Sequence, residues 1–163
     1  MSLLAKGFAG FAIAGVVASS AGAQGIVTQK NITLGLAQTI ANAAIERCRS
    51  MGYKVSVTVV DRAGLAVVMM RDDGAGLNTQ EGSDRKAYTA RAFSQPSAAF
   101  VKRLQDRPDT VGSRQYTRVL ALAGGLPIKV GDEIVGAVGV SRTPGKDDEC
   151  SQAGIDKVSD QLK

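Results

Sequence analysis

Two strand-turn-strand segments constrain the fold of this chain more than any other feature. Residues 55–71 (VSVTVVDRAGLAVVMMR) and residues 126–141 (LPIKVGDEIVGAVGVS) each place runs rich in β-branched residues on both sides of a short polar loop. The loops fall at residues 61–64 and 131–133. This arrangement is typical of β-hairpins. The sequence therefore predicts an antiparallel sheet as the core of the fold.

Helices are predicted around these hairpins. A first helix is predicted over residues 31–51, because apolar side chains recur there every four positions and Gly52 then ends the pattern. The recurring residues are Leu36, Ile40, Ala44 and Cys48. A second helix, with Ser83 as its N-cap, is predicted up to residue 93. Two further helices are predicted over residues 97–104 and over residues 147–162.

The remaining segments are predicted to be strands and loops. Strands are expected at residues 53–60, 65–71 and 118–122, in addition to the two strands of the second hairpin. Residues 72–76 and 107–116 are expected to be irregular. The order is helix, two strands, two helices, three strands and helix. It predicts an α+β fold with a five-stranded antiparallel sheet and helices packed on it.

Residues 1–23 have the pattern of a secretory signal peptide. Lys6 precedes an uncharged stretch at residues 7–18, and Ala21 and Ala23 form a small-x-small cleavage site. The alternative is a retained membrane-anchoring helix, but the stretch is shorter than the roughly 18 residues typical of a span. We expect a single mature domain at residues 24–163, located in the periplasm or secreted, with no membrane span after cleavage.

The charge distribution favours small anionic ligands over nucleic acid. Without Lys6, 19 of the 20 basic residues remain against 15 acidic ones, and they are scattered along the chain. Aromatic residues make up 4% of the chain and there is no Trp. The stacking platforms that bind single-stranded nucleic acid are therefore missing.

Cys48 and Cys150 are the two cysteines of the chain. In an oxidising compartment an even number of cysteines favours a disulfide, and the alternative is two small buried apolar side chains. The sequence leaves both open. The absence of a CxxC motif excludes thioredoxin-like chemistry and zinc sites built on several cysteines.

The chain contains no histidine. This excludes Ser-His-Asp and Cys-His nucleophile pairs, and it excludes metal sites that use imidazole. An acid-base enzyme would need a carboxylate or a lysine with a shifted pKa. The soft or phenolic side chains that could ligate haem iron, each of which is more often a core residue, are Met69, Met70, Tyr53, Tyr88 and Tyr116.

Arg71, Lys86 and Arg91 form a candidate anion site. Arg71 ends a predicted strand, and the other two lie on the helix that follows the glycine-rich loop. Converging cations could hold a carboxylate or a haem propionate by charge-assisted hydrogen bonds. The alternative is a set of local ion pairs, such as Arg71 with Asp72, or Asp84 with a lysine.

Several ordered motifs of this chain together resemble the GlcG/HbpS family of haem-binding-like proteins, and also the C-terminal domain of PduO-type proteins. The motifs are VTVVDRAG, RDDGAG, SDRKAYTA, GGLPIKVGDEIVGAVGVS and DDECSQAGID. The resemblance implies a five-stranded antiparallel sheet with helices and homo-oligomers with pockets near subunit contacts. It also implies haem binding in some exported members and a link to small-carboxylate metabolism in others.

The resemblance also implies a set of ligand-binding residues. They are Arg71, Lys86, Tyr88, Thr89, Arg91, Gly124, Gly125 and Pro127. Because histidine is missing, any haem here would not be His-ligated. The leading hypothesis is an exported oligomeric protein that binds haem, another tetrapyrrole or a small anionic metabolite. The alternatives are an enzyme or enzyme accessory that acts on a small hydroxy or keto acid, and a structural or signalling partner without a small ligand.

Overall fold

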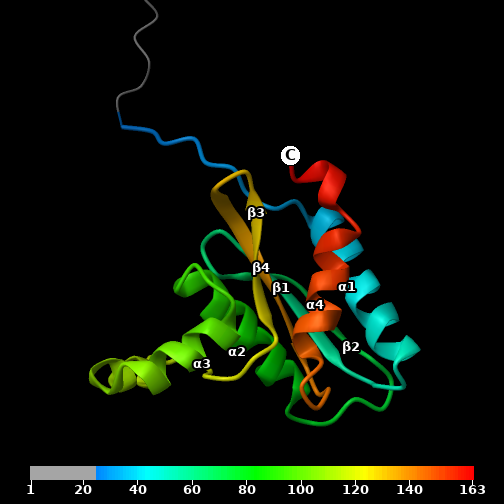
Figure 1. The fold of residues 1–163 in the computed structure, drawn as a ribbon. Coiled ribbons are helices and arrows are strands. Elements are labelled where there is room, and N and C mark those ends of the chain that lie inside the picture. Colours follow the sequence, from blue (N-terminus) through cyan, green and yellow to red (C-terminus); the bar gives the residue numbers. More distant parts are fainter. Residues whose placement is uncertain (1–24) are drawn as a thin grey trace, which may run out of the picture.

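A four-stranded antiparallel sheet forms the centre of the molecule in the computed structural model, which describes residues 25–163 (Figure 1). The strand order is β2-β1-β4-β3. The strands are β1 (Ser56–Asp61), β2 (Ala66–Arg71), β3 (Gly125–Val130) and β4 (Glu133–Ser141). The predicted signal peptide lies outside the described residues. None of the described helices combines the length and the apolar character needed to cross a bilayer.

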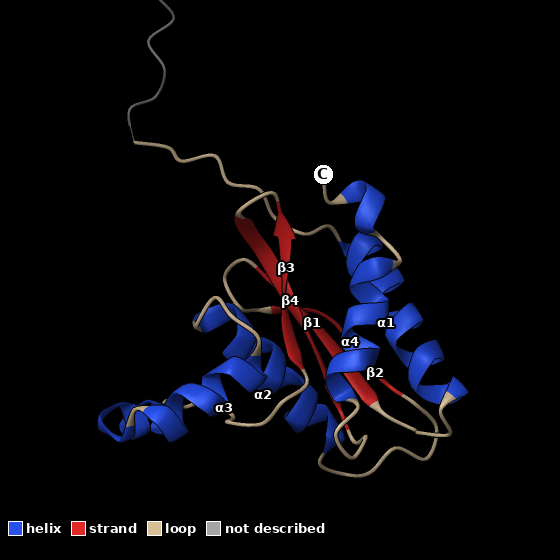
Figure 2. Cartoon of the chain, in the orientation of Figure 1, coloured by secondary structure: helices blue, strands red, loops and turns tan. Residues whose placement is uncertain are grey.

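Helices cover both faces of this sheet (Figure 2). The helices α1 and α4 pack together on one face, and α2 packs on the other, with α3 beyond it. They are α1 (Leu34–Ser50), α2 (Thr79–Ala92), α3 (Ser97–Asp106) and α4 (Asp147–Asp156). Two short 3₁₀ helices follow α3 and α4, at Pro108–Gln115 and Ser159–Gln161. The predicted α+β class is confirmed.

The prediction of a fifth strand at residues 118–122 is wrong. This segment bonds to side chains and to a loop instead of to a neighbouring strand. Leu120 N donates to Thr89 Oγ1 on α2 at 2.9 Å, and Arg118 Nη1 donates to the carbonyl oxygen of Gly64 at 2.8 Å. Val119 is buried, which explains the apolar pattern that suggested a strand.

Helix α1 and the disulfide follow the sequence pattern closely. The hydroxyl of Thr33 caps α1 by accepting a hydrogen bond from Leu36 N at 3.3 Å, so the helix begins at Leu34, three residues after the predicted start. Cys48 on the buried face of α1 forms a disulfide with Cys150 on α4, and their Cα atoms are 5.6 Å apart. Of the two possibilities for the cysteines, the disulfide is therefore the one that the structure contains.

The two faces of the sheet differ in chemistry. Val57 and Val59 of β1 join the large apolar core with α1 and α4. On the opposite face, Ser56 and Thr58 form hydroxyl pairs with α2, at 2.7 Å to Thr79 and 2.8 Å to Ser83. Ser83, which was predicted to be the N-cap of this helix, is therefore a buried residue inside α2. The N-cap in the structure is Asn78. Small polar contacts hold α2 against the sheet.

Gly139 on β4 allows this close approach of α2. A Cβ atom added there would lie 2.2 Å from the carbonyl oxygen of Ser83 and 2.5 Å from Ala87 N. A glycine inside a strand commonly marks such a close approach of another backbone.

The variant Gly139→Ala is expected to lower the free energy of unfolding by about 1–3 kcal/mol, because α2 must move away from the sheet. Urea denaturation measures this loss. The control is Gly35→Ala, since an added Cβ at the exposed Gly35 meets no atom within 4 Å. Equal stability of the two variants would contradict the close packing of α2.

Candidate functional site

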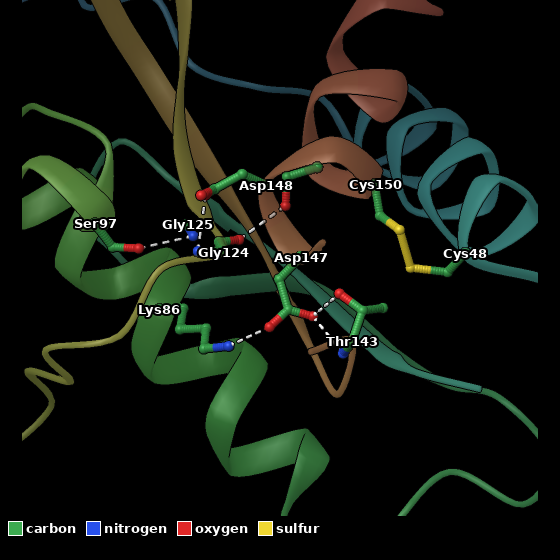
Figure 3. Close-up of polar contacts among 10 residues, drawn as sticks. Cys48, Lys86, Ser97, Gly124, Gly125, Thr143, Asp147, Asp148 and Cys150 are labelled. Atoms are coloured by element: carbon green, nitrogen blue, oxygen red, sulfur yellow. Dashed lines mark hydrogen bonds and ion pairs between the residues drawn. A yellow bond between two sulfur atoms is a disulfide. The ribbon is translucent and has the colours of Figure 1, made fainter. Parts of the chain in front are cut away.

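Lys86, one of the predicted anion-binding residues, is buried in an ion pair (Figure 3). Its side-chain nitrogen donates to Asp147 Oδ2 at 2.6 Å, and the residue is 4% exposed. Asp147 Oδ1 accepts hydrogen bonds from Thr143 N at 2.8 Å and from Thr143 Oγ1 at 2.9 Å. The anion that Lys86 binds in this structure is thus a carboxylate of the same chain, and the pair links α2 to the start of α4.

The Gly124–Gly125 turn lies beside this pair and is also occupied by protein groups. Gly124 N donates to Asp148 Oδ1, and Ser151 Oγ donates to the carbonyl oxygen of Gly124, both at 2.8 Å. A Cβ atom at Gly125 would lie 2.1 Å from the carbonyl oxygen of Lys86. The two glycines therefore allow close packing of β3 against α2. We name Lys86, Thr143, Asp147, Asp148 and Ser151 the buried polar cluster, in which Asp148 is half-buried.

Within the buried polar cluster, burial raises the pKa of Asp148, and the neighbouring Asp147 carboxylate raises it further. The hydrogen bond from Gly124 N and the charge of Lys86 act in the opposite direction. The folded state therefore binds the Asp148 proton more tightly than the unfolded state does. The stability that this proton contributes is present at low pH and is lost as pH rises through the raised pKa.

The variant Asp148→Asn is expected to be more stable than the wild type at neutral pH, because the amide oxygen still accepts from Gly124 N and carries no charge. This advantage should shrink as pH falls from the raised pKa of folded Asp148 to the usual Asp pKa of about 4, and it should be largely gone below that value. Urea denaturation across this pH range tests it. The control is Asp132→Asn, whose side chain is exposed in the turn between β3 and β4. A pH-independent difference would contradict the assignment.

Three other predicted residues have structural contacts. Thr89 is buried, where its hydroxyl donates to the carbonyl oxygen of Arg85 and accepts from Leu120 N. Pro127 is half-buried on β3, opposite Ala137. Tyr88 lies under the guanidinium of Arg118, whose central carbon is 4.3 Å from the ring centre.

Arg71 lies far from the other predicted cations. Its side chain donates to the carbonyl oxygen of Ala75 at 2.8 and 3.1 Å. The predicted partners of the local ion pairs were wrong. Asp72 pairs with Arg49 instead of Arg71, and Asp84 pairs with Arg118 instead of a lysine. The shortest distances are 2.6 Å and 2.8 Å respectively.

Arg91 lies in a hollow of about 420 Å³ on the surface of the protein. Its lining residues are Gln29, Asn31, Arg62, Ala63 and Arg91, and we name it the arginine hollow. Arg62 pairs with Glu133 at the start of β4. Among residues 25–163, no carboxylate forms an ion pair with Arg91, and its Nε atom is buried without a hydrogen-bond partner. We therefore take this hollow as the candidate anion site.

The structure does not bring Arg71, Lys86 and Arg91 together. Arg71 lies opposite Ser56 at the beginning of β1, whereas Arg91 shares a hollow with Arg62 just beyond the end of that strand. A strand of six residues is about 20 Å long. The anion-binding role of Arg91 therefore stays a prediction, and the residues around it differ from those predicted. Sequence reasoning missed Arg62, which stands in the polar loop of the first hairpin, and Asn31, for which no sequence signal exists.

The arginine hollow contains no side chain that would ligate haem iron. Both cysteines are in the disulfide, and Tyr53 and Met70 pack against the apolar core. Met69 and Tyr116 are more exposed, at 43% and 64%, Tyr88 lies under Arg118, and none of the three lines the hollow. In the part of the chain that the structure describes, no group of three Cys, Asp or Glu side chains could hold a metal ion. The lining residues therefore offer cationic side chains but none of the predicted ligands of haem iron.

Comparisons with known proteins agree on one family. The family model described as "Haem degrading protein HbpS-like" matches residues 32–156. An uncharacterised 15.0 kDa protein from the dhaT-dhaS intergenic region of Citrobacter freundii is 31% identical over 112 residues, which are 68% of this chain and 79% of that protein.

Solved structures give the same result. The crystal structure of HbpS has a TM-score of 0.77 at 34% identity, over 83% of this chain and 96% of HbpS. The PduOC:Heme complex shares the fold, with a TM-score of 0.70 at 23% identity over 78% of this chain and 94% of that one. The resemblance to the GlcG/HbpS family is confirmed. With most of its described residues matched, the chain belongs to the HbpS-like family of haem degrading proteins.

Proposed function

We propose that this protein binds haem or another tetrapyrrole and holds its carboxylates at the arginine hollow. The observation that carries the proposal is the similarity to HbpS at 34% identity over 83% of the chain. The family description names haem degradation, and a relative of the same fold has been crystallised with haem.

The chemistry of the arginine hollow supports this ligand class. Arg91 forms no ion pair among residues 25–163, and it lies beside Arg62 in a hollow lined by no carboxylate. A guanidinium binds a carboxylate by charge-assisted hydrogen bonds that are about twice as strong as neutral ones. The propionates of a tetrapyrrole supply such carboxylates, whereas the hollow offers no ligand to iron. We therefore expect metal-free protoporphyrin to bind about as tightly as haem.

Export and self-association are part of the proposal. The leader pattern of residues 1–23 supports export, and so does the Cys48–Cys150 disulfide, because disulfides persist in oxidising compartments. The arginine hollow is open to the surface, so a second subunit could complete its walls. A homo-oligomer in the periplasm or outside the cell is the form in which we expect the ligand to bind.

Absorbance titration of the purified protein with haem and with protoporphyrin tests the proposal. We expect binding at micromolar protein with a shifted Soret band. Arg91→Gln should weaken both ligands by about 10-fold or more, since a charged hydrogen bond contributes roughly 1.5–3 kcal/mol. The control is Arg114→Gln, an exposed arginine on the 3₁₀ helix that follows α3.

Two results would overturn the proposed function. The first is a Soret band that stays unchanged at micromolar protein. The second is turnover of small 2-hydroxy or 2-oxo acids by a protein that binds no tetrapyrrole, which would favour the enzyme alternative.

A further inference from the structure

A second hollow, of about 370 Å³, lies next to the arginine hollow and is lined mainly by apolar side chains. We name it the apolar cleft. Its apolar walls are Ile32, Leu36, Val130, Val135 and Leu162, and its polar rim consists of Lys30, Asn31, Thr33 and Gln161. The walls come from the segment that enters α1, the end of β3, the beginning of β4 and the C-terminal residues, which lie at one end of the molecule (Figure 1).

Asn31 lines both hollows, so they adjoin at this residue. Its Oδ1 atom accepts a hydrogen bond from Ile32 N at 2.9 Å on the side of the cleft. The same oxygen accepts from Arg62 N at 3.0 Å on the side of the arginine hollow. Asn31 therefore ties the loop of the first hairpin to the segment that enters α1, and it fixes the two hollows relative to one another.

The arginine hollow is lined by cationic side chains, whereas the apolar cleft is lined mainly by apolar ones. Arg62 and Arg91 line one, Lys30 lies on the rim of the other, and neither lining contains a carboxylate. Glu133 pairs with Arg62, and Arg91 has no carboxylate partner among residues 25–163. A cationic end and an apolar end together match a ligand with an anionic head and an apolar body.

We propose that the arginine hollow and the apolar cleft form one continuous site for amphipathic carboxylates. The carboxylate lies against Arg91, and the apolar body extends past Asn31 into the cleft. A tetrapyrrole with propionates belongs to this ligand class, and for that ligand alone the inference rests on the proposed function. A long-chain alkyl carboxylate belongs to the class as well and tests the geometry independently of haem.

A series of saturated carboxylates from butanoate to dodecanoate tests the inference by calorimetry with the wild-type protein. Each buried methylene should raise the affinity about fourfold until the cleft is filled. Dodecanol, which has the same chain without the charge, should bind at least about 10-fold more weakly than dodecanoate. An affinity that does not change with chain length would sink the inference.

Two variants test the contributions of the apolar cleft and of the arginine hollow separately. Leu162→Gln should flatten the dependence on chain length and leave butanoate binding unchanged, whereas Arg91→Gln should weaken all the carboxylates by a similar factor. Leu162 is half-buried next to the last residue, so the variant is expected to fold, and thermal unfolding checks this. The control is Leu77→Gln, whose side chain is 93% exposed. Wild-type-like chain-length dependence in Leu162→Gln would overturn the inference.

The outcomes for this inference and for the proposed function are distinguishable. If long-chain carboxylates bind with the expected dependence but tetrapyrroles do not, the amphipathic site stands and the proposed function fails. The opposite result is also possible: tetrapyrroles bind and require Arg91, but Leu162→Gln binds them like the wild type and the affinity for alkyl carboxylates does not depend on chain length. In that case the proposed function stands and the cleft is not part of the site.

Discussion

Replacing both Cys48 and Cys150 by alanine is expected to lower the free energy of unfolding by about 4–5 kcal/mol. The disulfide joins residues 102 positions apart, and a cross-link that closes a loop of about 100 residues removes that much conformational entropy from the unfolded chain. It also fastens α1 to α4 on the apolar face of the sheet. Urea denaturation of the oxidised wild type and of the double variant measures the difference.

Reduction of the wild type gives the control for this experiment. Both cysteines are fully buried, so the reductant has to be added to the unfolded protein before refolding. The reduced wild type and the double alanine variant should then agree within about 1–2 kcal/mol, because they differ in two small buried groups. A double variant as stable as the oxidised protein would mean that the cross-link contributes no stability.

Lys86→Met is expected to lower the free energy of unfolding by about 3–5 kcal/mol. The variant leaves the Asp147 carboxylate buried without its cation, and an uncompensated buried charge costs about that much. Thr143 still donates two hydrogen bonds to this carboxylate, but neither supplies a positive charge. Chemical denaturation at neutral pH is the appropriate measurement.

A second substitution distinguishes charge from packing. The double variant Lys86→Met with Asp147→Asn removes the charge and keeps an oxygen that accepts from Thr143, so it should recover a large part of the loss. The matched control is Lys146→Met, an exposed lysine paired with Glu149 at 3.5 Å, for which we expect about 1 kcal/mol or less. If Lys86→Met behaves like Lys146→Met, the buried ion pair is not important for stability.

Local patterns in the sequence were sufficient to predict most of the fold. The two hairpins follow from β-branched runs around polar loops, and α1 follows from an apolar side chain at every fourth position. The segment at residues 118–122 has the same apolar character as a strand, yet its backbone bonds to Thr89 on α2. A strand needs a neighbouring strand, and residue types alone do not say whether one is present.

The candidate site was less predictable, because its members meet only in the folded chain. Arg91 was predicted, but its neighbours Arg62 and Asn31 come from a hairpin loop and from the segment before α1. Lys86 was predicted to bind an anion, and its partner Asp147 stands 61 positions away in the sequence. The sequence alone therefore could not show which charged side chains form ion pairs within the protein.

The close packing of α2 has a consequence for how ligands reach the arginine hollow. Because Gly139 and Gly125 leave no space between the sheet and this helix, α2 cannot tilt without losing contact along its length. Arg91 lies near the C-terminal end of α2, so the packing of this helix holds the backbone of Arg91 in place before any ligand binds. We therefore expect a ligand of the arginine hollow to bind without a rearrangement of α2, at a rate set by diffusion and by the motion of side chains.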